Sequence, residues 1–183
     1  MLIRLDSHLL SLTFLLWCLS VPVSAEELTR SDRGMNNARL DVLIKRIDKK
    51  AEGRPGYWRF SVKDVIVTVI TDNKADRMRI FVPVIQTDKL NTDVLTRLLQ
   101  ANFDSALDAR YAIAKGVVWS AFIHSLSPLQ DKEFLEGIGQ VVNLNKTFGS
   151  SYSSGSLVFQ GGDSKSLQRR KLIDDLLKKG LSV

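Results

Sequence analysis

The chain is 183 residues long, 44% hydrophobic and 25% charged, and its formal net charge is +6. This length is enough for one domain with a substantial core. Acidic and basic residues are interleaved along the chain, which indicates solvated helix faces and excludes nucleic acid as an expected partner.

The first 25 residues have the three-part pattern of a secretory signal. Arg4 supplies a basic start, residues 9–19 form an apolar run, and small residues precede a cleavage position after Ala25. The run is shorter than the roughly 20 residues that span a bilayer, and the bulky residue before Cys18 disfavours a lipoprotein. We therefore expect a cleaved signal peptide, residues 1–25, and a periplasmic or secreted protein, with an uncleaved anchor as the alternative. Cleavage would remove the only cysteine, and with it disulfides, thiolate catalysis and cysteine-based metal sites.

The next segment predicts one helix followed by three strands. From Met35, apolar residues recur at helical spacing over about four turns, up to a cluster of glycine and proline. Residues 58–62 alternate between apolar and polar, which is typical of a strand with one solvated face. Residues 65–70 are mostly β-branched and predict a strand buried on both faces. Residues 78–85 predict a third strand, at an edge or bulged, because Pro83 cannot donate to a ladder.

The second half predicts two helices separated by a hairpin, and then a tail. Asn91 or Thr92 caps the first of these helices. Its apolar face is expected to consist of Val94, Leu95, Leu98, Leu99 and Phe103. A hairpin is expected over 111–123, and the next helix is expected to begin at Ser127-Pro128. A Ser/Gly-rich linker, 150–166, precedes an amphipathic helix over 167–180.

The element order is therefore α-β-β-β-α-β-β-α, followed by a C-terminal amphipathic helix. A doubly wound parallel sheet needs regular alternation of strands and helices, which this order lacks. The sequence predicts an α+β domain over 35–149, with an antiparallel β-sheet covered by helices.

Four segments carry a resemblance to a known family: 57–62, 76–80, 98–103 and 109–126. Together with the element order, they resemble the type III secretion chaperone-like fold, which includes the class I secretion chaperones and the YbjN-type proteins. The resemblance covers about residues 35–148. It implies a homodimer that holds another protein, or an extended segment of one, on its surface without catalysis. Those chaperones are typically cytosolic and acidic, whereas this chain is basic and carries the predicted signal.

Several charged residues lie beside apolar segments, where an unpaired charge is costly. They are Asp76, Arg77, Arg79, Asp104, Asp108 and Arg110. One interpretation is a set of ion pairs that fixes the register of the hairpins. The other is a polar rim around an apolar groove for a partner, formed by Arg77, Arg79, Asp104, Asp108 and Arg110.

His124 is the only histidine after the signal. With a serine and Asp108 or Asp104 it would make the triad of a hydrolase; otherwise it simply closes a strand of the hairpin. One histidine and acidic residues without EF-hand spacing predict no metal and no cofactor. The terminal helix is expected to dock on the protein itself or on a dimer partner, or to make weak contact with an anionic membrane surface.

These observations lead to one main hypothesis and two alternatives. The main hypothesis is an exported, non-catalytic module that binds another protein and forms a homodimer. The alternatives are a hydrolase using His124 and a membrane-surface or lipid-binding module.

Overall fold

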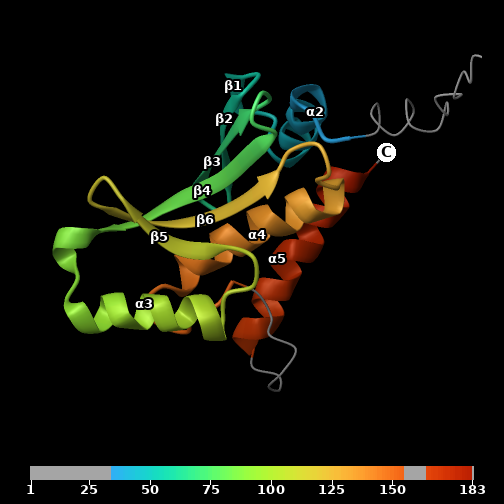
Figure 1. The fold of residues 1–183 in the computed structure, drawn as a ribbon. Coiled ribbons are helices and arrows are strands. Elements are labelled where there is room, and N and C mark those ends of the chain that lie inside the picture. Colours follow the sequence, from blue (N-terminus) through green and yellow to red (C-terminus); the bar gives the residue numbers. More distant parts are fainter. Residues whose placement is uncertain (1–33, 155–163, 183) are drawn as a thin grey trace, which may run out of the picture.

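The computed structural model describes residues 34–154 and 164–182, with the side chains of 164–169 outside that description. The predicted signal, 1–25, and most of the predicted linker therefore lie outside the described residues. Figure 1 shows one mixed fold of helices and strands.

Six strands form a single sheet in the order β1-β2-β3-β4-β6-β5, and every neighbouring pair is antiparallel. The strands are β1 (Glu52–Arg54), β2 (Tyr57–Val62), β3 (Val65–Asp72), β4 (Arg77–Gln86), β5 (Arg110–Ala114) and β6 (Val117–Ser125). The helices are α2 (Asn37–Ile47), α3 (Thr92–Asp104), α4 (Asp131–Thr147) and α5 (Ser164–Leu181), with a short 3-10 turn, η1 (Thr87–Lys89). The predicted α+β class with an antiparallel sheet and a C-terminal helix is confirmed.

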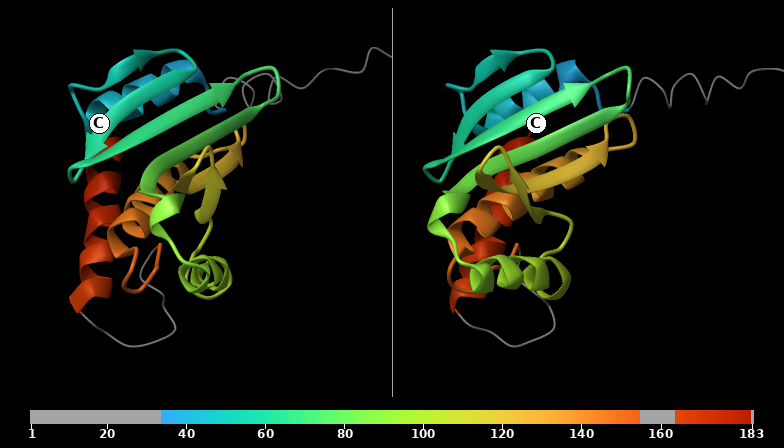
Figure 2. Two further views of the ribbon diagram at one scale, coloured as in Figure 1. Left: turned by 90° about the vertical axis from the view of Figure 1, so that its left-hand side faces the viewer. Right: turned by 60° about the vertical axis from the view of Figure 1, so that its left-hand side comes forward.

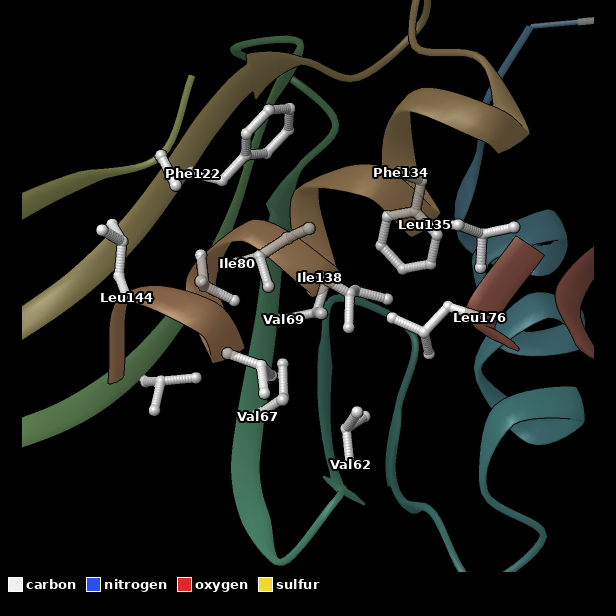
Figure 3. Close-up of a cluster of buried hydrophobic side chains, with 14 of the residues drawn as sticks. Val62, Val67, Val69, Ile80, Phe122, Phe134, Leu135, Ile138, Leu144 and Leu176 are labelled. Atoms are coloured by element: carbon white, nitrogen blue, oxygen red, sulfur yellow. The ribbon is translucent and has the colours of Figure 1, made fainter. Parts of the chain in front are cut away.

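The core lies between one face of the sheet and the helices α2, α4 and α5 (Figures 1 and 2). In Figure 3, Val67 and Ile80 of the strands meet Ile138 of α4, and Leu176 of α5 lies at one end of the cluster. Full burial of one such side chain stabilises the fold by about 1.5–3 kcal/mol. Helix α3 stands apart from this layer and contacts β5 at the edge of the sheet.

Strands β3 and β4 differ in part from the prediction. Strand β3 was expected to be buried on both faces, but Ile66 is 40% exposed while Val67 is fully buried. The prediction was wrong because helices cover only one face of this sheet. Strand β4 lies between β3 and β6, so it is not an edge strand. The alternative prediction of a bulge is confirmed, since the register shifts between Pro83 and Ile85.

Strand β1 was absent from the prediction because Gly53 and Pro55 indicated only a turn. Gly53 pairs with Trp58 and has a φ of 147°, a conformation that side chains rarely adopt. A Cβ at Gly53 would also collide with the backbone of Tyr57. Glycine therefore lets the chain turn back and add a short edge strand.

Helix α4 begins at Asp131, four residues after the predicted start at Ser127. Gln130 and Glu133 form a reciprocal capping box, in which the Gln130 N–H donates to Glu133 at 2.8 Å. Ser127 is engaged elsewhere, because its N–H and hydroxyl donate to the Asp76 carboxylate at 2.7 and 2.9 Å. This long-range contact replaces the local cap that the sequence suggested.

Helix α5 begins at Ser164, earlier than the predicted 167, and packs against α4 and α2. Leu172 and Leu176 are buried, as expected for a helix that docks on its own domain. Helices α4 and α5 approach closely at Gly139 of α4, where a Cβ would lie 2.6 Å from the Ile173 side chain of α5. Within the described chain, no helix is long and apolar enough to cross a bilayer.

The first residues of the predicted linker are packed against the domain. Tyr152 and Ser154 are buried. The Ser154 hydroxyl accepts the Leu107 N–H at 2.6 Å, and Asn143 of α4 donates to the Ser154 carbonyl at 3.1 Å. This segment thus joins the end of α3 to α4.

Candidate functional site

The face of the sheet turned away from α2, α4 and α5 carries a patch of apolar and cationic side chains, which we call the open face. Side chains alternate along each strand, so those that do not point into the core point here. The apolar and cationic side chains of the open face are Arg54, Tyr57, Arg59, Ile66, Ile70, Arg77, Arg79, Phe81, Arg110, Trp119 and Ile123. Tyr57, Ile66 and Ile123 are 44%, 40% and 59% exposed, so the patch is accessible.

Strand register arranges these side chains in rows across the sheet. Ile70 lies opposite Tyr57 on one side and Arg79 on the other. Arg79 in turn lies opposite Ile123. The row therefore crosses four strands and places one cation among three apolar side chains. Residues opposite one another on neighbouring strands are close enough to bind a single ligand together.

An aromatic pair lies in the next positions along the same strands. Phe81 and Trp119 meet edge to face, with ring centroids 5.5 Å apart. The Trp119 indole donates to the Ala114 carbonyl at 3.0 Å, which holds the ring in place. The open face thus offers a preformed aromatic contact beside Arg79.

The arginines of the open face have few partners among the residues that the structure describes. Arg59 and Arg79 make no ion pair or side-chain hydrogen bond there, and Arg77 donates to the Ser125 hydroxyl at 2.6 Å. These guanidinium groups retain donors for a bound molecule.

The structure separates the charged residues that the sequence singled out. Arg77 and Arg79 lie on the open face. Asp104 ends α3 and pairs with Arg97 at 3.0 Å. Asp108 and Arg110 lie beside a different pocket at the start of β5. Asp104 and Asp108 therefore lie apart from Arg77 and Arg79. Arg110 precedes the buried Tyr111 and lies opposite Ala121, so it belongs to the open side of the sheet and also borders this pocket.

Asp76 belongs to the loop that precedes β4, where its carboxylate binds Ser127. The hydrogen bonds from the Ser127 N–H and hydroxyl lower the pKa of Asp76 below its ordinary value. This contact ties the β3–β4 turn to the chain that leads into α4. It fits the interpretation in which these charges fix the positions of hairpins.

A polar pocket of about 380 Å³ lies at the start of β5, where β6 extends past Arg110 beside α4. The described residues that line it are Asp108, Arg110, Phe122, Ile123, His124, Glu133, Glu136 and Gln140. Gln140 organises its wall: the side-chain oxygen accepts the N–H groups of Asp108 and Ala109 at 2.9 Å, and the amide donates to the Asp108 carboxylate at 2.9 Å.

His124 shares this pocket with Asp108, one of the acidic partners that the sequence suggested for a triad, but not with a nucleophile. Its ring stacks on Phe122, and Nδ1 is 2.8 Å from the Ser125 carbonyl. No serine, threonine or cysteine is among the described residues that line the pocket. No group of three or more histidine, cysteine or acidic residues in the described chain is placed to hold a metal ion.

A second exposed apolar surface lies on α3, and we call it the α3 surface: Leu99 and Phe103. The sequence placed Leu99 and Phe103 on the buried side of the helix, but they are 72% and 91% exposed. Leu98 and Ala101 are the buried residues of α3. The prediction was wrong in orientation because α3 packs on the edge strand β5 and on Tyr152 and so buries only a narrow stripe.

Asn102 holds α3 against that edge. Its amide donates to the Tyr111 carbonyl at 3.0 Å and its oxygen accepts the Tyr111 N–H at 2.7 Å. The outer side of β5 is thereby closed at Tyr111, which protects an otherwise free edge strand. The Tyr111 hydroxyl donates to the Leu144 carbonyl at 2.7 Å, and burial raises the pKa of that phenol.

No protein-family model matches this sequence, and no curated protein matches it either. Among solved structures, the chain is similar to one described as "Structure of the HopA1-SchA Chaperone-Effector Complex". The TM-score is 0.46 at 10% identity, over 61% of this chain and 94% of that chain. The fold described above therefore rests on the strand order and packing of this chain, and membership of the chaperone-like family stays a prediction.

Proposed function

We propose that this protein is an exported, non-catalytic module that binds another protein, or an extended segment of one, on its open face. The observation that carries this proposal is the exposed combination of Tyr57, Ile123 and the Phe81–Trp119 pair with arginines. Tyrosine, tryptophan, phenylalanine and arginine are the residues enriched in protein interfaces. An uncovered apolar patch edged by polar groups marks an interaction site.

The exported location is supported by the signal pattern of residues 1–25. It directs the search for a partner to the periplasm or the exterior. The chaperone-like resemblance of the sequence supports binding of an extended segment.

We further propose that the working form is a homodimer built through the α3 surface. Leu99 and Phe103 are one helical turn apart. A second copy of α3, packed antiparallel about a two-fold axis, would bring Leu99 of one protomer against Phe103 of its partner. The same arrangement would bury two of the most exposed apolar side chains of the described chain.

The alternatives find less support. Leu172 and Leu176 of α5 are buried in the domain, so this apolar stripe is not available to a membrane surface. His124 lacks a nucleophile among the described residues of its pocket. The open face is left as the surface best suited to a function.

Site-specific photocrosslinking tests the binding proposal directly. A photoreactive amino acid at Ile123 or Ile66 should give discrete adducts with one or a few proteins in living cells. The same group at Lys49, an exposed turn position away from the sheet face, is the matched control. Equal adduct patterns from all three positions would argue against a specific binding face.

A further inference from the structure

We infer that the open face selects a partner segment that is extended and acidic, with carboxylates at alternate positions next to an apolar residue. The inference rests on the proposed protein-binding function and specifies the chemistry of the bound segment. It follows from three properties of the cations on the sheet: all are arginines, they are spaced two residues apart along β4, and they lack ion pairs among the described residues.

Every cation within the six strands is arginine. These residues are Arg54, Arg59, Arg77, Arg79 and Arg110, whereas Lys63, Lys74 and Lys115 occur in the turns. Arginine presents a planar fork that binds a carboxylate through two parallel hydrogen bonds, and lysine does not. Arginine alone on a sheet face is therefore suited to carboxylate recognition.

The spacing along β4 matches an extended ligand. Arg77, Arg79 and Phe81 are successive residues on the open side of β4, at intervals of two residues. Each interval is about 6.8 Å in an antiparallel strand. An extended segment lying along β4 repeats its own side chains on one face at the same interval. It can therefore place two carboxylates on the arginines and an apolar side chain on Phe81 and Trp119.

The charge on this face is only partly compensated within the protein. Glu52 lies opposite Arg59 and Asp72 lies opposite Arg77, yet neither makes an ion pair there. The Asp72 carboxylate instead accepts the N–H groups of Lys74 and Ala75 at 3.0 Å. Arg79 has no acidic residue opposite it, because its neighbours across the sheet are Ile70 and Ile123. A bound carboxylate would supply the missing counter-charge.

These observations favour a peptide over an anionic membrane. Arginine forks bind lipid phosphates as well as carboxylates, so the distinction rests on the spacing and the shape of the face. The strands of an antiparallel sheet also twist relative to one another, which suits a narrow segment better than a flat surface. Membrane binding is kept as one outcome of the test.

The experiment measures binding of three fluorescein-labelled peptides of about 12 residues to the full-length protein by anisotropy, at low and at high salt. The acidic peptide has glutamate at two alternate positions and phenylalanine two residues further on, and the others carry lysine or glutamine in place of glutamate. We expect the acidic peptide to bind at least about tenfold more tightly than the lysine peptide at low salt, with the difference shrinking as salt screens the charges.

The variant Arg79→Glu should lose about tenfold in affinity for the acidic peptide and gain affinity for the lysine peptide. Arg79→Lys should recover only part of the affinity, because it keeps the charge and loses the fork. Lys49→Glu is the matched control and should change neither affinity. Arg79 is exposed, and an unchanged melting temperature will show that each variant is folded.

Three results would overturn the inference. If acidic and glutamine peptides bind equally and Arg79→Glu has no effect, protein binding stands but the acidic preference falls. If no peptide binds while phosphatidylglycerol vesicles do, and Arg79→Glu abolishes vesicle binding, the occupant is a membrane and the proposed function falls with it. If Arg79→Glu changes the mass of the protein in solution, the open face is occupied by a second copy.

Discussion

Phe81 and Trp119 meet edge to face on the uncovered side of the sheet, with their planes at 80° and their ring centroids 5.5 Å apart. They belong to strands paired through Phe81 and Ala121 and through Pro83 and Trp119. The contact combines two aromatic side chains outside the main core, two residues along β4 from Arg79. In the proposed function, this is where an apolar contact and the cation of Arg79 would meet one partner segment.

Trp119→Ala should weaken binding of the acidic peptide by about tenfold or more, because aromatic side chains at the centre of an interface carry much of the binding energy. Trp119 is only half-buried, so we expect the free energy of unfolding to fall by no more than about 1–2 kcal/mol. Anisotropy and urea unfolding measure the two effects. Unchanged affinity with normal stability would place the binding surface elsewhere.

Phe103→Asp should convert the proposed dimer into a folded monomer. The side chain is 91% exposed within one chain, so its replacement costs the isolated fold little, while a charge in an apolar helix pair is strongly unfavourable. Light scattering after size exclusion should show half the wild-type mass. Gln100→Asp, an exposed position on the same helix, is the control. A wild-type protein that is monomeric at high concentration would contradict the prediction.

Asp76 should make stability depend on pH in acid. Hydrogen bonds from Ser127 lower its pKa below the ordinary value of 3.8, so the unfolded chain binds the proton more readily than the folded one. Its contribution is thus fully present above about pH 5 and is lost as the pH falls below 3.8 through the folded pKa. We expect Asp76→Asn to be less stable than wild type at pH 7, and the gap to close in acid.

Urea unfolding at a series of pH values from neutral to about pH 2.5 would measure this difference in stability, because carboxylates titrate within that range. The pKa values of Asp41 and Asp48 are also lowered, Asp41 chiefly by Lys45 and Asp48 chiefly by the Ser61 N–H. Asp41 and Asp48 should therefore also lose stabilising effect in acid, equally in the wild type and in Asp76→Asn. A gap that stays constant with pH would show that Asp76 acts through shape and not through charge.

Gly139→Ala should loosen the docking of α5. A Cβ at this position would lie 2.6 Å from Cγ1 of Ile173, so the helices must separate, at a cost of about 1–3 kcal/mol. We expect faster amide exchange and faster proteolysis in α5. The double variant Gly139→Ala/Ile173→Ala should recover much of the protection. If it does not, the defect lies within α4 and not at the contact between the helices.

The alternation of residues 57–62 is enough to predict strand β2, because period two is a local property of the chain. The helical spacing of Leu40, Leu43 and Ile44 predicts α2 in the same way. Features set by distant residues escaped prediction. The start of α4 depends on the hydrogen bonds that Ser127 donates to Asp76, 51 positions away. The orientation of α3 depends on the hydrogen bonds between Asn102 and Tyr111 of β5.

The residues of the candidate site also show this difference between local and long-range features. The sequence identified Arg77 and Arg79 as unusual because they are charges inside an apolar segment. It grouped them with Asp104 and Asp108, which the fold places on the end of α3 and beside another pocket. The sequence did not predict Phe81 and Trp119 as site residues, because an aromatic residue in a strand usually lies in the core.

What the sequence determined by itself is the order of the helices and of every strand except β1, together with the alternation of β2 and the apolar stripe of α2, since these follow from local periodicity and local turns. Only the tertiary structure decided which apolar face stays uncovered and which charges meet. Three helices lie on one side of the six-stranded sheet. On the opposite side, strand register places Arg79 of β4 next to Ile123 of β6. Both outcomes depend on contacts between residues far apart in the chain, which local patterns do not encode.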